Sequence, residues 1–371
     1  MKAIIEQLKV IDKKLWILLG VVIFVFIFGM LISKLIYSVG NSNKSYAEVE
    51  AIMKEAAIKY YADSENKAVL PEEGEDVSVG DRVLSEGGYM KPLDKLIKKG
   101  TCTGKVTVTK EGINYIYASY LDCGKDYKTI EFYNKLIENV VEAGDGLYTD
   151  TNGYAFRGEN PNNYISIDDD LWRIVSIRDD NTIELVSTTS VDMIIWDNRY
   201  NSSEKFQTGY NDFNKSRLKE SLQTILEENT TKSHKAAIVP NSIKNILIPV
   251  NNCADKYGEK ATDFSKCNIR NDLNLSIISI PEYMKASLDS NCKTPGSKEC
   301  MNYNYLTTKT EYLTLTGNAD NSYQIYVIRN SGAIKADEAN GYSDIYPVVR
   351  IPDSVMYVSG EGTKTKPYVI R

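Results

Sequence analysis

Side chains of the types that perform catalysis are scarce in this chain. Its only histidine is His234, which lies in a polar stretch, 230–235, typical of an exposed loop. Ser–His or Cys–His catalysis would therefore depend on that residue. Ser216 and Lys219 have the SxxK spacing, which places a lysine one helical turn from a serine, but no KTG or SDN partner occurs in the sequence. We expect no catalytic residue and no enzymatic activity.

Oxygen ligands for calcium are the one cofactor chemistry that the sequence leaves open. The run Asp168, Asp169 and Asp170 and the segment 145–152 supply carboxylates and amides, whereas calcium needs about six to eight oxygens that converge from loops. Neither stretch has EF-hand spacing, and Asp and Asn are also ordinary turn residues. Among 50 acidic residues no carboxylate pair is singled out for glycoside hydrolysis. A surface glycan hydrolase therefore remains an alternative function.

Two aromatic residues in the segment IIWDNRYNSS are candidates for stacking on a sugar ring, namely Trp196 and Tyr200. The two isoleucines before Trp196 also fit a tryptophan that ends a buried strand. Tyrosine is abundant, with 26 residues, and suits both sheet packing and recognition surfaces.

The cysteines are more informative than any catalytic motif. All six follow residue 100, and their spacing suggests three local disulfides, pairing Cys102 with Cys123, Cys253 with Cys267, and Cys292 with Cys300. No CxxC occurs and no cysteine is near His234 in the sequence, which argues against a metal site. Disulfides indicate an oxidising compartment.

The apolar run 15–33 carries no charge and is long enough to cross a bilayer as a helix. We expect a transmembrane helix over 15–37, with the lipid bilayer as its partner. Lysines in the tail 1–14 favour a cytoplasmic N-terminus. The chain is then a single-pass protein of the cell membrane with its bulk outside. A signal peptide cleaved after the small residues 38–40 is the competing interpretation.

The rest of the chain is long enough for two domains, which we place at 38–142 and 143–371. The first begins with an amphipathic helix that Ser45 and Glu48 introduce as a capping box, followed by a hairpin at 101–121 and a helix at 129–142. The second contains strands at 172–177, 183–186, 303–306, 311–316, 323–329 and 346–351, and helices at 214–228 and 279–287. A net charge of −6 argues against a nucleic-acid partner.

The arrangement over 15–125, an apolar helix, an amphipathic helix and a small disulfide-bonded sheet, resembles type IV pilins and pseudopilins. That resemblance implies a pilin-like membrane-proximal domain. The prepilin processing signature is missing from the sequence. A membrane-proximal stalk domain is therefore the alternative to a polymerising subunit.

A second resemblance covers most of 144–371. Its motifs are FRGENPNNY (156–164), LWRIVSI (171–177), SIPEYMKAS (279–287), NYL (304–306), YPVVRI (346–351) and SGEGTKTKPYVI (359–370). In this order they resemble a bacterial surface-protein domain of unknown function, which we associate with the C-type-lectin-like fold of formylglycine-generating-enzyme-like modules. Where that family tends to carry Trp and Arg-Pro, this chain has Tyr312 and Tyr346-Pro347. The resemblance makes both tyrosines candidate ligand-binding residues.

We therefore expect an α+β chain with one N-terminal transmembrane helix, a pilin-like domain and a C-type-lectin-like domain. Its expected function is adhesion or recognition of an extracellular glycan or protein ligand by the distal domain. The alternatives are a minor pilin-like subunit or scaffold that associates laterally with itself, and the surface glycan hydrolase already mentioned.

Overall fold

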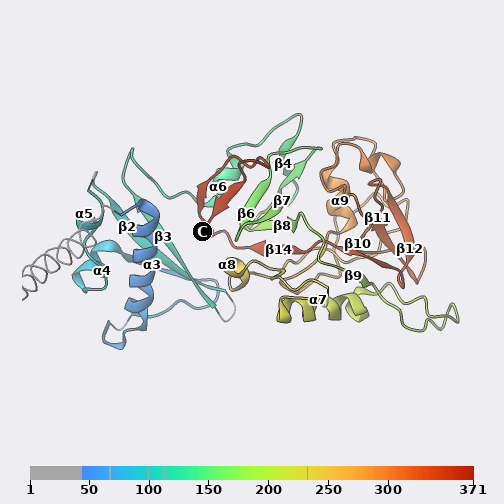
Figure 1. Ribbon diagram of the computed structural model, residues 1–371, viewed down its shortest axis with the longest axis horizontal. Coiled ribbons are helices and arrows are strands. Elements are labelled where there is room, and N and C mark those ends of the chain that lie inside the picture. Colours follow the sequence, from blue (N-terminus) through green and yellow to red (C-terminus); the bar gives the residue numbers. More distant parts are fainter. Residues whose placement is uncertain (1–43, 67, 99, 112–113, 232) are drawn as a thin grey trace, which may run out of the picture. The chain divides into compact units, whose positions relative to one another are not determined.

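A computed structural model describes residues 44–371 apart from 67, 99, 112–113 and 232 (Figure 1). The chain forms two compact units. The first comprises the described residues up to Val69, Ser78–Val106 and Ser119–Lys128, and the second comprises Leu70–Val77, Thr107–Ala118 and Thr129–Arg371.

Helix α3 (Tyr46–Ala62) is the main helix of the first unit, and its start confirms the predicted capping box. The Ser45 hydroxyl accepts a hydrogen bond from the Glu48 N–H, while the Glu48 carboxylate accepts one from the Ser45 N–H at 2.8 Å. This reciprocal pair satisfies two N–H groups that a helix start leaves without partners. The buried face of the helix includes Val49, Met53 and Ala57. The shorter helices are η1 (Ser64–Asn66), α4 (Asp81–Glu86) and α5 (Leu93–Leu96).

A three-stranded sheet has the order β1-β2-β3 and contains the predicted hairpin. Its strands are β1 (Asp76–Gly80), β2 (Thr103–Glu111) and β3 (Asn114–Asp122). The disulfide between Cys102 and Cys123 joins the outer ends of β2 and β3. The disulfides Cys253–Cys267 and Cys292–Cys300 are also present, so all three predicted pairs are confirmed.

The largest sheet of the second unit has eight strands. Its main path runs through β14 (Val348–Ile351), β8 (Ile183–Ser187), β7 (Asp170–Arg178), β6 (Tyr164–Ile167), β16 (Tyr368–Ile370) and β15 (Tyr357–Ser359). The hairpin of β4 (Gly146–Asp150) and β5 (Gly153–Arg157) joins this sheet through the pairing of β5 with β7. Figure 1 shows β7 and β8 as neighbouring arrows.

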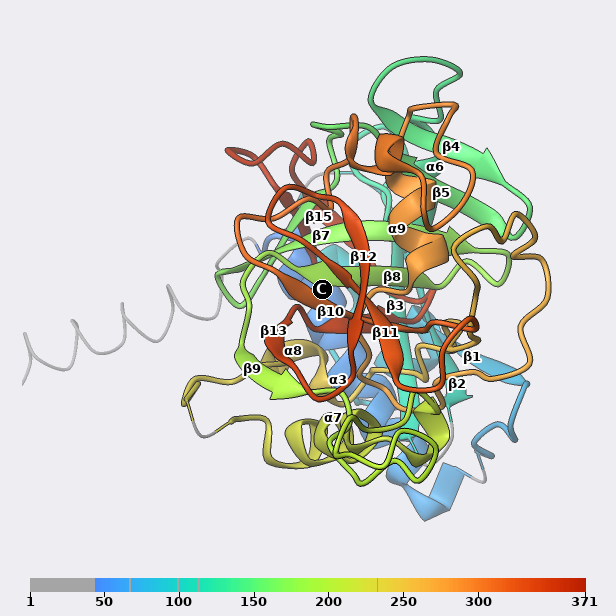
Figure 2. The ribbon, with the colours of Figure 1, turned by 90° about the vertical axis from the view of Figure 1, so that its right-hand side faces the viewer.

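A second sheet of this unit has five strands in the order β12-β11-β10-β13-β9. They are β12 (Ile334–Glu338), β11 (Gln324–Ile328), β10 (Tyr312–Gly317), β13 (Tyr342–Ile345) and β9 (Asp192–Ile195). The helices of the unit are α6 (Phe132–Ile137), η2 (Phe213–Lys215), α7 (Arg217–Glu228), α8 (Asn241–Lys244), α9 (Ile280–Ala286) and η3 (Lys298–Met301). Helix α9 packs against β5 and β10, and its place beside β5 is seen in Figure 2.

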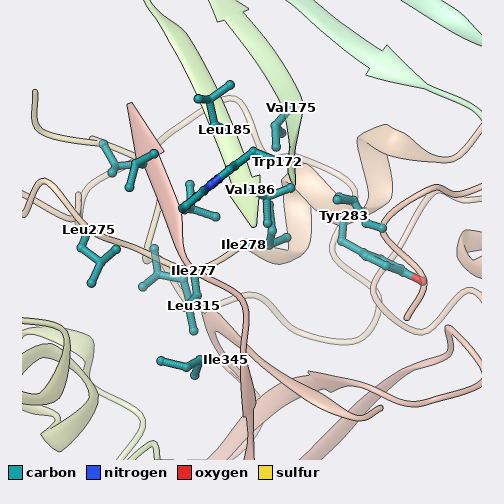
Figure 3. Packing of buried hydrophobic residues seen from close by; sticks show 14 of the residues in the cluster. Trp172, Val175, Leu185, Val186, Leu275, Ile277, Ile278, Tyr283, Leu315 and Ile345 are labelled. Carbon is teal, nitrogen blue, oxygen red and sulfur yellow. The ribbon is translucent and has the colours of Figure 1, made fainter. Parts of the chain in front are cut away.

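One apolar core joins both sheets of the second unit. Figure 3 shows Trp172 of β7 beside Leu185 and Val186 of β8, with Leu315 of β10 and Ile345 of β13 in the same cluster. All five side chains are buried. Burial of large apolar side chains is worth about 1.5–3 kcal/mol each. Because both sheets contribute to this core, it fixes the position of one sheet relative to the other.

Most of the predicted elements in the second unit are confirmed, with shifted boundaries. The predicted helices at 129–142, 214–228 and 279–287 correspond to the shorter helices α6, α7 and α9. The strand expected at 303–306 is wrong, because this segment forms turns in which the Asn304 side chain accepts a hydrogen bond from the Leu306 N–H at 3.0 Å. Strands β12, β13, β15 and β16 were not expected.

The predicted fold class needs correction. The described chain is a mixed α+β fold dominated by sheets, and none of its helices in residues 44–371 is long and apolar enough to cross a membrane. The longest of them, α3, has 17 residues and carries several charged side chains, including Lys54 and Glu55. The stretch 15–37, for which the transmembrane helix was predicted, and the tail 1–14 lie outside the described residues.

The disulfide at the β2–β3 hairpin gives a first testable expectation. Replacing both Cys102 and Cys123 by alanine removes a cross-link that spans 21 positions, which lowers the free energy of unfolding by about 3 kcal/mol. Hydrogen exchange should then be faster at the amides of β2 and β3. The control is the pair Cys292→Ala and Cys300→Ala, which should leave β2 and β3 protected. Unchanged protection of the hairpin in the first variant would contradict its stabilising role.

Candidate functional site

A cavity of about 610 Å³ in the second unit brings together residues from distant parts of the chain. Its volume lies within the usual range for small-molecule sites, about 300–1,000 Å³. Aromatic, basic and hydroxyl side chains line it. The four tyrosines are Tyr164, Tyr305, Tyr312 and Tyr346, and the three basic residues are Arg173, Lys309 and Lys364. No aspartate or glutamate is among the described residues that form its wall.

The β6–β7 hairpin places the arginine in this cavity. Asp168 and Asp169 form its two-residue turn, with φ angles of 50° and 71°, and such turns require positive φ at both central residues. The Asp168 carboxylate also accepts a hydrogen bond from the Ser242 N–H at 2.9 Å, which lowers its pKa. The resulting register sets Tyr164 directly opposite Arg173. The acidic run considered above for calcium is thus a hairpin turn, and calcium binding stays a prediction.

The described groups that contact the Arg173 guanidinium are neutral. It lies 4.2 Å from the centre of the Tyr164 ring and 4.5 Å from that of Tyr305. Its Nε donates to the Asn163 side chain at 2.8 Å and its Nη1 to the Tyr164 hydroxyl at 3.1 Å. Nη2 makes a longer bond of 3.4 Å to the Pro161 carbonyl. These contacts fix the orientation of the charged group.

Arg173 has no carboxylate within ion-pair distance in the part of the chain that the structure describes. Burial lowers the pKa of Arg173, while the more distant charge of Asp145 acts in the opposite direction. The Asp145 carboxylate accepts hydrogen bonds from the N–H groups of Glu159 and Asn160. Because an arginine stays protonated in proteins, the cavity wall contains a fixed positive charge that is not paired with a carboxylate of the described residues.

Two of the four predicted ligand-binding residues meet in this cavity. The rings of Tyr312 and Tyr346 lie 5.2 Å apart at 70°. The Tyr312 hydroxyl donates to the Leu306 carbonyl at 2.9 Å, and burial raises the pKa of Tyr312 well above its usual value. The Tyr346 hydroxyl is 3.0 Å from the Thr310 hydroxyl. These contacts hold both rings against the cavity wall.

Trp196 and Tyr200 are not part of the cavity. Trp196 follows β9 and is fully buried, with its indole N–H donating to the Thr314 carbonyl at 3.1 Å. Tyr200 is 58% exposed. Ser216 of the SxxK pair caps α7, where its hydroxyl accepts a hydrogen bond from the Lys219 N–H at 3.1 Å.

Sequence reasoning missed Arg173, Tyr164 and Tyr305. A signal for the arginine was present, because it is the one charged residue within the apolar run 171–177. Strand alternation places it on the face opposite its neighbour Trp172. Its partner Tyr164 is separated from it by a turn whose register the sequence pattern did not reveal.

A second group of charges lies between α9 and the β7–β8 hairpin. The Arg178 Nη2 is 2.5 Å from Glu184 Oε2 and 3.8 Å from Glu282 Oε1, and the Glu184 side chain has no exposed surface. Glu282 also caps α9, accepting a hydrogen bond from the Ser279 N–H at 2.8 Å. Burial, together with the charge of Glu184, raises the pKa of Glu282 to about 8, although Arg178 opposes the shift.

Glu282 and Arg178, together with Asp150 and the disulfide Cys253–Cys267, line a smaller cavity of about 130 Å³. Glu184 is not part of that wall. The two glutamates therefore do not face a common ligand space, as the acid and the nucleophile of a glycosidase must. We interpret the group as a buried network that fastens α9 to the sheet.

One set of potential metal ligands occurs among the described residues, namely Cys253, Asp255 and Cys267. Its two sulfur atoms are bonded to each other, so neither is a thiolate that can bind a metal. The Asp255 carboxylate accepts hydrogen bonds from the N–H groups of Asn268 and Ile269. It therefore acts as a loop cap.

No protein-family model matches the chain, and no match was found among curated proteins or among solved structures. The pilin-like and lectin-like resemblances therefore stay predictions. The function has to be argued from the cavity itself.

Glu282 gives a prediction on pH dependence. Its pKa of about 8 in the folded chain lies above its ordinary value of 4.5, so that between these values the folded state holds a proton that the unfolded state has released. The free energy of unfolding should therefore fall as pH rises through this window and level off above about pH 8. Glu282→Gln, which is neutral at every pH, should remove this component.

Urea denaturation between about pH 5 and pH 9 measures the effect. The exposed Glu220 of α7 offers a control, since Glu220→Gln should keep the pH dependence of the original chain. An equally steep pH dependence in the Glu282→Gln variant would contradict a proton held at Glu282.

Proposed function

We propose that this protein is a binding protein that recognises an anionic ligand in the Arg173 cavity of its second unit. The observation that carries the proposal is the charge of the wall. Among the residues that the structure describes, three basic ones and no acidic one line the cavity, although the whole chain has a net charge of −6. A cluster of one sign of charge in a concave site raises the local concentration of ligands of the opposite sign.

The positions of the basic residues suggest separate tasks. Arg173 is half-buried and held by its neighbours, whereas Lys309 and Lys364 are exposed. A guanidinium fork suits directional hydrogen bonding to an anion. Exposed lysines add long-range attraction that speeds encounter and weakens as salt increases. Tyr346, which is half-buried and packs on the buried Tyr312, supplies ring surface for the uncharged part of the ligand.

The three disulfides support an oxidising, extracytoplasmic location for this activity. Adhesion and ligand recognition at a cell surface fit that location. The proposal does not depend on a particular mode of attachment.

An array of glycans and matrix proteins, probed with the full chain, tests the proposal. The chain should bind anionic glycans or proteins of the array more strongly than their neutral counterparts. This binding should weaken as the salt concentration rises from about 0.05 M to about 0.3 M. Exclusive retention of neutral entries, or none at all, would contradict the proposal.

Matched charge variants assign binding to the cavity. The pair Lys309→Gln and Lys364→Gln should reduce binding of the retained anion about three- to tenfold, since each exposed contact is worth roughly 0.2–1 kcal/mol. The pair Lys293→Gln and Lys298→Gln changes the net charge equally at exposed positions outside the cavity. That control should bind like the original chain. Equal losses in the two pairs would show a general charge effect and overturn the assignment.

A further inference from the structure

The hydroxyl groups of the same cavity narrow the class of ligand. Ser187, Thr188 and Thr308 line the wall. Each gives its proton to a backbone carbonyl: Ser187 to Thr189 at 2.9 Å, Thr188 to Leu171 at 2.6 Å, and Thr308 to Thr310 at 2.7 Å. A hydroxyl has a single proton but two lone pairs. The Ser187 hydroxyl also accepts a hydrogen bond from the Thr189 N–H at 3.1 Å, which leaves it one lone pair. Toward a ligand these three side chains therefore act as hydrogen-bond acceptors.

Two of the tyrosine hydroxyls are engaged by the fold. The Tyr312 hydroxyl donates to the Leu306 carbonyl at 2.9 Å, and the Tyr305 hydroxyl donates to the Ile174 carbonyl at 3.4 Å. Both side chains are buried, with exposed fractions of 2% for Tyr312 and 6% for Tyr305, so these hydroxyls offer no proton to a ligand. The hydroxyls of Ser187, Thr188 and Thr308 are thus complementary to a ligand that carries several O–H donors.

Arg173 supplies the opposite polarity. Its Nη1 and Nη2 each carry two protons, and each makes one bond to a described residue, to Tyr164 and Pro161 respectively. One N–H therefore remains on each terminal nitrogen. Two such donors match the two oxygens of a carboxylate, which a guanidinium binds in a two-pronged arrangement.

We propose that the ligand of this cavity is a sugar acid, a hydroxylated ring that carries a carboxylate, with the carboxylate on Arg173. This inference rests on the anion-binding function proposed above and specifies its ligand. The ring hydroxyls donate to Ser187, Thr188 and Thr308, and the ring lies against the tyrosines. A simple aliphatic acid lacks the O–H donors. A neutral sugar lacks the charge. The aliphatic acid and the neutral sugar should therefore both bind more weakly than the sugar acid.

Calorimetric titration of the full chain with small probes tests the inference. The probes are four uronates (glucuronate, galacturonate, mannuronate and iduronate), with glucose, hexanoate and glucose 6-phosphate for comparison. At least one uronate should bind about tenfold or more tightly than glucose and hexanoate, since each hydrogen bond to a charged group is worth roughly 1.5–3 kcal/mol. Glucose 6-phosphate should bind more weakly than that uronate.

Two variants separate the contributions of charge and of hydroxyl groups. Arg173→Gln should weaken uronate binding about 10- to 100-fold and leave glucose binding nearly unchanged. Thr188→Val keeps the shape of an exposed residue and removes an acceptor. It should weaken uronate binding about three- to tenfold and leave hexanoate binding unchanged. Because Thr188 is exposed, this second variant keeps the test valid if Arg173→Gln does not fold.

The possible failures are distinguishable. Hexanoate or glucose 6-phosphate binding as tightly as the best uronate, or no uronate binding, would overturn the sugar-acid inference. The anion-binding function would survive if anionic array entries still required Lys309 and Lys364. If no uronate bound and the retention of anions did not depend on Lys309 and Lys364, both proposals would be overturned.

Discussion

The two-residue turn at Asp168 and Asp169 fixes the register on which the candidate site depends. It pairs Ile165 with Trp172 and Tyr164 with Arg173. Because side chains alternate across a strand, one face of the hairpin carries Ile165 and Trp172 into the core, and the other carries Tyr164 and Arg173 to the cavity. A slip of one residue would exchange the two faces. It would expose the tryptophan and bury the guanidinium in the apolar core.

Several other arginines of the same unit have carboxylate partners, which Arg173 lacks among the described residues. Arg178 is paired with Glu184, Arg329 with Glu311 and Asp337, and Arg350 with Asp180. Burying a charge without a partner is costly, so such pairing is the expected arrangement. Arg157 also lacks a carboxylate in the described chain, but it does not line the larger cavity. Within the described part of the chain, Arg173 therefore combines the lack of a carboxylate partner with access to a ligand space.

Sequence patterns predicted the local elements well and the site only in part. Capping by Ser45, the β2–β3 hairpin and the disulfides depend on residues close in the sequence, and these were predicted. Tyr312 and Tyr346 were named as ligand-binding candidates through a resemblance, whereas Tyr305 and Arg173 were not named. The cavity joins β6, β7 and β10 with the segments around 308 and 364. Such long-range contacts depend on tertiary packing, which no local periodicity encodes.

The threonine hydroxyl groups of the cavity wall both hold the loops in place and face the proposed ligand. Thr188 follows β8, where its side chain bonds to the Leu171 carbonyl, and Thr308 bonds to the Thr310 carbonyl just before β10. The Leu171 carbonyl also accepts a hydrogen bond from the Thr188 N–H at 3.2 Å, so Thr188 is held through both its backbone and its side chain. The proton of each hydroxyl is thereby committed to the fold, and only its acceptor capacity remains for a ligand. The polarity of the cavity is thus a consequence of how its loops are held, and a change that relaxed those loops would also change which ligand donors the wall accepts.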